Sequence, residues 1–174
     1  MTDVHPFSRP IRLNQIGQGV TRTLEPDAAE RTAIARWLDL EALDEMSVEV
    51  TLAPAHEDDV WALSGRVRAR VVQACGLTLQ PLPALVDQTF KVRLAEASEA
   101  VEGEIEVTLE DDAPDLIENG QVDLGHHAVE QLSLALDPFP RAPGAEFQPP
   151  EPEAEISPFA ALRALKVRGD DPGS

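Results

Sequence analysis

Several sequence features that would identify a class of protein directly are scarce or missing. The 174 residues contain one cysteine, Cys75, so an internal disulfide framework is excluded and a reducing compartment is favoured. No apolar run approaches the roughly 20 residues that a membrane helix needs, and no charged-then-apolar leader opens the sequence. These absences favour a soluble, cytoplasmic protein.

Catalytic and metal-binding motifs are also missing. There is no phosphate-binding glycine loop, no paired metal-ligand spacing and no nucleophile elbow. His126 and His127 are adjacent, so on a helix they would point about 100° apart, and solvated positions explain them better than a shared metal site. We therefore expect no enzyme, no metal and no cofactor. An active site formed by Asp123, Glu130 and a histidine in one closed pocket is the weakest hypothesis.

Basic residues are few, and their placement is uneven. Lys and Arg number 14 against 32 Asp and Glu, for a net charge of -18. Residues 94–156 hold Arg141 alone against 17 acids, a net of -16, whereas residues 1–93 are close to balance. Such an acidic block repels nucleic acid and membranes. A basic surface elsewhere could still act, because exposed charges more than about 10 Å apart are largely screened at physiological salt.

Residues 60–94 carry the most informative pattern. In an extended chain successive side chains alternate between faces, so Leu63, Val67, Ala69 and Val71 share one face. The next run alternates in the same way and follows a break at 73–76. We therefore predict an antiparallel pair with an apolar face and a basic face. The basic side chains are Arg66, Arg68, Arg70, Lys91 and Arg93.

The remaining chain predicts further strands and two packing helices. Alternation predicts strands over 10–16, 47–52 and 103–109, and Gly65 predicts a bulge or bend that would curl the sheet. Acids and a proline at 25–30 predict the start of a first helix that packs through Trp37, and Asp123 is a natural cap for a second, which ends before Pro138. The fold class is α+β: a curved, mainly antiparallel, partly barrel-like sheet with two packing helices and a short C-terminal helix on a flexible tether.

The sequence divides into one domain and its appendages. We predict a disordered start over residues 1–9, a single α+β domain over 10–140, a Pro/Glu-rich linker over 141–156, a short helix over 157–168 and a tail over 169–174. Ser157 and Pro158 begin the terminal helix, and Phe159, Leu162 and Leu165 form its apolar stripe. A helix this short orders only against something else, either the parent domain or a partner.

The basic face supports a binding hypothesis. Arg66, Arg68 and Arg70 recur about 6.8 Å apart, close to the phosphate repeat of an extended RNA strand, and guanidinium groups suit phosphates. Equally, these arginines could pair within the sheet with Glu104, Glu106 or other carboxylates. Aromatic stacking partners are scarce, with only Trp61 and Phe90 nearby, so phosphate contact is better supported than base reading.

A second hypothesis is a protein-interaction module. Here the acidic block and the terminal stripe would bind a basic partner such as a ribosomal protein, through Phe159, Leu162, Leu165 and Lys166. The alternative is that the terminal helix folds back on its own domain.

Three segments together resemble the YceD family, named for large ribosomal RNA subunit accumulation. They are the break around Cys75 and Gly76 between two basic strands, the stretch from Asp123 and Leu124 through Glu130 to Pro138, and the end Pro-Phe-x-x-Leu-x-x-Leu-Lys at 158–166. Their order and spacing cover most of the chain.

The resemblance implies a small α+β protein that is not known as an enzyme and is linked to accumulation of large-subunit ribosomal RNA. Its expected partners are ribosomal RNA or a large-subunit precursor. Many relatives carry a second cysteine three positions before Cys75, where this sequence has Val72, so a metal role in relatives does not carry over.

Overall fold

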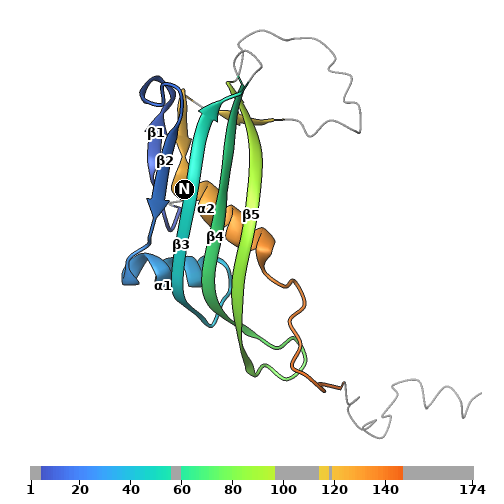
Figure 1. The fold of residues 1–174 in the computed structure, drawn as a ribbon. Helices are drawn as coiled ribbons and strands as arrows, with labels where there is room; N and C mark the ends of the chain where they lie inside the picture. The colour runs from blue at the N-terminus through green and yellow to red at the C-terminus, as the bar shows by residue number, and fades with distance from the viewer. Residues whose placement is uncertain (1–4, 56–59, 97–113, 118, 147–174) are drawn as a thin grey trace, which may run out of the picture.

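The computed structural model describes residues 5–55, 60–96, 114–117 and 119–146 (Figure 1). The α+β class is confirmed. Two α-helices, α1 (Ala28–Trp37) and α2 (Leu124–Ala135), accompany one short 3-10 turn, η1 (Leu13–Gln15). The strands are β1 (Pro10–Arg12), β2 (Val20–Leu24), β3 (Ala42–Pro54), β4 (Val60–Ala74), β5 (Pro81–Glu96), β6 (Asp115–Ile117) and β7 (Gln121–Asp123).

The main sheet has five strands in the order β2-β3-β4-β5-β6, and β1 and β7 form a separate pair. All its pairings are antiparallel except that of β5 with β6, which is parallel. Within the described residues β2 and β6 are edge strands, so no closed barrel forms. The long strands β3, β4 and β5 stand side by side and bend gently along their length (Figure 1).

The predicted antiparallel pair is confirmed as β4 and β5. The register joins Arg66 to Thr89 and Arg68 to Asp87, without a shift from Val60 to Ala74. On β4 the predicted apolar side chains Leu63, Val67, Ala69 and Val71 are all buried. Period-2 alternation therefore gave the correct faces.

Gly65 does not mark a bulge. The register runs unbroken through it on both sides, and the one irregularity in β3 lies between Leu43 and Glu45. The glycine is required by close packing instead. A Cβ at this position would lie 2.8 Å from the Phe90 ring and would collide with the Glu49 carbonyl oxygen. The aromatic ring covers a strand position that has room only for hydrogen.

Gly65→Ala should therefore destabilise the domain. We expect a loss of about 2 kcal/mol in the free energy of unfolding, as overpacking of a filled core usually costs. Urea unfolding measures it, with Ser64→Ala on the opposite face as the control. Equal midpoints for the two variants would contradict this packing role.

Both helices lie on one side of the main sheet. Asp27 caps α1 by accepting from the Glu30 N–H, and the Glu30 carboxylate accepts from the Asp27 N–H in return. Asp123 caps α2 as predicted, and Leu124, Val129 and Leu132 are buried. Figure 1 shows α2 crossing behind the long strands. No helix among the described residues is long and apolar enough to cross a membrane.

Local patterns missed several features. Residues 1–9 were predicted to be disordered, but of the described part, residues 5–9, Phe7 is buried in the core and Arg9 donates to Asp123. The strand expected over 10–16 ends at Arg12, and β2 was not predicted. Trp37 was expected to pack but is 47% exposed. The predicted strand over 103–109 and terminal helix over 157–168 lie outside the described residues.

Candidate functional site

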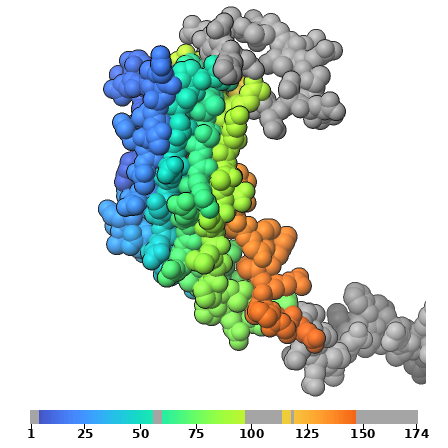
Figure 2. Space-filling model, in the orientation of Figure 1, coloured from blue at the N-terminus to red at the C-terminus, as the bar shows by residue number. Residues whose placement is uncertain are grey.

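The candidate site is the outer face, which we define as the side of β2 to β5 opposite the two helices. Figure 2 shows this side, with the long strands β3, β4 and β5 making up its middle. Arg66, Arg68 and Arg70 lie there at alternate positions of β4, and all three are exposed. Lys91 and Arg93 lie beside them on β5, opposite Ser64 and Ala62. The five predicted cations therefore share one face.

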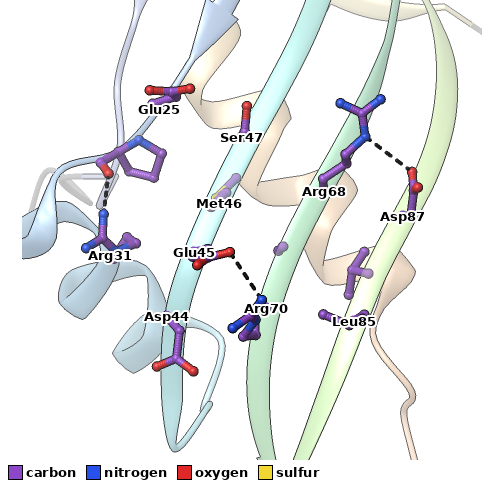
Figure 3. A pocket seen from close by; sticks show the side chains of 13 residues that line it. Glu25, Arg31, Asp44, Glu45, Met46, Ser47, Arg68, Arg70, Leu85 and Asp87 are labelled. Carbon is purple, nitrogen blue, oxygen red and sulfur yellow. Dashed lines mark hydrogen bonds and ion pairs between the residues drawn. The ribbon is translucent and has the colours of Figure 1, made fainter.

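The arginines are paired with carboxylates of the same sheet. Asp87 accepts from Arg66, with Nη2 to Oδ2 at 2.6 Å, and lies 3.9 Å from Arg68. Glu45 lies 3.7 Å from Arg70. Figure 3 shows Arg68 directed toward Asp87 and Arg70 toward Glu45. Glu104 and Glu106, which the sequence suggests as possible partners, lie outside the described residues. The carboxylates that pair with the arginines in the structure are Asp87 and Glu45.

These ion pairs are solvent-exposed. The Arg66 and Asp87 side chains are 47% and 48% exposed. The hydrogen bond from Arg66 lowers the pKa of Asp87, and the same bond raises the pKa of Arg66. Exposed pairs contribute little to stability because water screens them. The loss of this pair would therefore cost the fold little.

The outer face has two unlike ends. A hollow of about 630 Å³ lies over the end of this face that carries Glu45 and Arg70, with Asp87 at one side (Figure 3). Four carboxylates line it against three guanidinium groups: Glu25, Asp44, Glu45 and Asp87, and Arg31, Arg68 and Arg70. Toward the other end Arg66 lies opposite Thr89 and Glu49, Lys91 lies opposite Ser64, and Arg93 lies opposite Ala62. Asp87, which lines the hollow, is hydrogen-bonded to Arg66 at this second end.

Cys75 is fully buried where the turn after β4 meets the segment after α2. Its Sγ accepts the Ala142 N–H at 3.3 Å, and the Gly76 N–H donates to the Pro140 carbonyl at 2.9 Å. Hydrogen bonds from the Thr78 hydroxyl and from nearby backbone N–H groups lower the pKa of Cys75 to about 6. The thiol joins two distant segments, which the sequence did not indicate.

Asp123, Glu130 and the histidines do line one hollow, but it is open and its groups are engaged. Asp123 accepts from the Ser8 hydroxyl at 2.5 Å and from the Arg9, Gly125 and His126 N–H groups. Glu130 lies 3.1 Å from His126 and 3.0 Å from His127. Asp123 therefore acts as a helix cap that also holds the N-terminal segment.

Metal ligands are not grouped in the part of the chain that the structure describes. No set of three His, Cys, Asp or Glu side chains there could hold an ion. The histidines, predicted to be solvated, are half-buried, and His126 Nδ1 lies 2.8 Å from His5 Nδ1. The candidate partner-binding residues Phe159, Leu162, Leu165 and Lys166 lie outside the described residues.

Comparisons with known proteins place the chain in a family. Residues 63–166, which are 104 of the 174, match the family model described as large ribosomal RNA subunit accumulation protein YceD. Comparison with curated proteins gives no match, and comparison with solved structures gives none either. The matched range includes β4 from Leu63 onward, β5 and α2, together with the motif residues Cys75, Gly76, Asp123, Leu124, Glu130 and Pro138. The chain belongs to the YceD family.

Proposed function

We propose that this protein is a non-enzymatic accessory of ribosome biogenesis that supports accumulation of large-subunit ribosomal RNA. It acts in the cytoplasm on ribosomal RNA or a large-subunit precursor. It contacts RNA phosphates through the outer face, with Arg66, Arg68, Arg70, Lys91 and Arg93. The family description supports the ribosomal role, and the clustered cations support the mode of contact.

One observation carries the RNA contact: three arginines recur at alternate positions of β4, and all three side chains are exposed. Alternate residues of a strand are about 6.8 Å apart, similar to the spacing of phosphates along an extended RNA strand. A strand of RNA running along β4 would therefore meet successive guanidinium groups. Few aromatic side chains are available, which favours phosphate contact over reading of bases.

The salt dependence of binding tests the proposal. Fluorescence anisotropy with labelled single-stranded segments of large-subunit ribosomal RNA measures affinity between 50 and 200 mM salt, a range over which phosphate contacts lose roughly tenfold or more. The logarithm of the binding constant should fall linearly with the logarithm of salt concentration. Absence of binding to these segments and to precursor particles at low salt would refute the RNA contact.

Asp87→Asn should increase RNA affinity. Asp87 is hydrogen-bonded to Arg66 and lies within 4 Å of Arg68. A phosphate that binds these arginines must therefore displace the Asp87 carboxylate. Removing its charge at nearly constant size should tighten binding about two- to fivefold, the range of an exposed ion pair. The same anisotropy assay measures this, with Asp44→Asn as a control. Asp44 lines the same hollow without a described ion pair. Unchanged or weaker binding by the Asp87 variant would show that this pair does not compete with RNA.

A further inference from the structure

Two adjoining hollows lie along α2. The first is lined by Trp37, Leu38 and Leu134 together with His5, Asp115, His126, Val129, Glu130, Gln131 and Ser133. The second is lined by Leu38, Leu136 and Pro140 together with Asp39, Gln73, Ala74, Ser133, Asp137 and Pro138. Leu38 and Ser133 line both, so the two hollows adjoin. We call this the α2 groove.

The α2 groove exposes apolar side chains that the described chain covers only in part, the His5 ring lying 5.5 Å from the Trp37 ring. Trp37 is 47% exposed and Leu134 is 78% exposed, although both belong to helices that otherwise pack on the sheet. Trp37 and Leu134 line the same hollow, and an exposed apolar patch of this kind is typical of a surface that another segment covers.

The charges of the α2 groove have one sign. Four carboxylates line it, Asp39, Asp115, Glu130 and Asp137, and no lysine or arginine does so among the described residues. Glu130 lies beside His126 and His127, and Asp137 accepts from the Phe139 N–H. No hydrogen bond or ion pair of the Asp39 or Asp115 side chain occurs within the part that the structure describes. The occupant of this groove should therefore be apolar and basic.

The end of this chain has that composition. Residues 157–168 contain Phe159, Leu162 and Leu165 at three-residue steps and Arg163, Lys166 and Arg168, with no acid among them. The rest of the chain after residue 94 is strongly acidic, so the apolar and basic character is confined to this segment. The family match also extends to residue 166.

We propose that residues 157–168 dock in the α2 groove of their own chain, with Phe159, Leu162 and Leu165 against Trp37 and Leu134. The cations of the segment then face the groove carboxylates. This inference does not depend on the proposed RNA contact. The apolar stripe of Phe159, Leu162 and Leu165 would then bind the domain of its own chain and not a separate protein.

The length of the connection allows this docking. The described chain runs past the groove at Pro140, is held at Ala142 by the Cys75 thiol and ends at Glu146. Residues 147–156 can span roughly 33 Å, whereas the 12 residues of α2 are about 18 Å long. A short flexible tether gives an effective concentration in the millimolar range, so even a weakly binding segment would be docked most of the time.

Quenching of Trp37 by neutral acrylamide in the full-length chain tests the docking. Trp61→Phe leaves Trp37 as the only tryptophan. Into this background we introduce Leu162→Asp with Leu165→Asp. Loss of two apolar contacts should lower the docking equilibrium constant at least about tenfold, so acrylamide quenching of Trp37 should rise. In the chain with both tryptophans, the indole N–H resonance of Trp37 should shift in the same variant, which provides a readout should Trp61→Phe unfold the protein.

The matched control is Ala160→Asp with Ala164→Asp, which adds the same charge on the side of the predicted helix opposite the stripe. It should leave Trp37 protected, whereas Leu134→Glu in the groove should expose Trp37 as the Leu162 and Leu165 pair does. Equal Trp37 signals for the stripe and control pairs would overturn the proposal. Protection that disappears on dilution, with a dimer seen by light scattering, would also overturn it in favour of docking on a second copy.

Discussion

Exchange of Arg66, Arg68 and Arg70 for glutamate should lower the affinity for ribosomal RNA at least about a hundredfold at low salt, because three phosphate contacts are lost and repulsion replaces them. The salt slope should fall by about 2, since each phosphate contact on a single strand contributes about 0.7. Anisotropy with labelled ribosomal RNA segments measures both quantities. Co-sedimentation with precursor particles should fall in parallel.

The matched control exchanges Arg12, Arg22 and Arg36 for glutamate. This variant has the same change in net charge, and these three exposed arginines lie outside the β4 row. It should retain most of the affinity. Because new glutamates would face Asp87 and Glu45, a second variant with glutamine at 66, 68 and 70 separates loss of contact from loss of fold. Equal binding by the β4 variants and the control would remove the outer face from the proposed function.

Asp123→Ala should destabilise the domain by about 3 kcal/mol, combining a lost helix cap with lost bonds between a charged group and the N-terminal segment. Asp123 caps α2 and accepts from Ser8 and Arg9, so its removal releases two elements. Urea unfolding measures the loss. Asp27→Ala is the matched control, because Asp27 caps α1 without holding another segment and should cost about 1 kcal/mol. Equal losses would contradict the second role of Asp123.

The effect of Asp123→Ala should depend on pH. Burial raises the pKa of Asp123, but the bonds from Ser8, Arg9, His126 and Gly125 outweigh it and hold the pKa below its ordinary value. A carboxyl whose pKa is lowered by folding stabilises the protein fully above its unfolded pKa of about 3.9 and loses this contribution as pH falls through the folded pKa. The difference between wild type and Asp123→Ala should therefore persist at neutral pH and shrink below about pH 4.

The sequence alone determined those helices and strands that a pattern of neighbouring residues predicts. Alternation from Val60 to Leu94 set the faces of β4 and β5 and therefore gathered the five cations on one side, because side chains on a strand repeat every two residues. Asp123 and the apolar stripe after it determined α2 in the same way, through a cap and a helical repeat.

Only the tertiary structure decided which side chains from distant segments are in contact. Asp87 follows the same alternation as Lys91 and Arg93, but its pairing with Arg66 depends on the register of β4 and β5, which local periodicity does not encode. The burial of Phe7, the pairing of β1 with β7 and the contact of Cys75 with Ala142 each join segments more than 60 residues apart. Such contacts depend on how whole elements pack, so only the folded chain showed that the arginines already have carboxylate partners and that Trp37 lies at a partly covered groove.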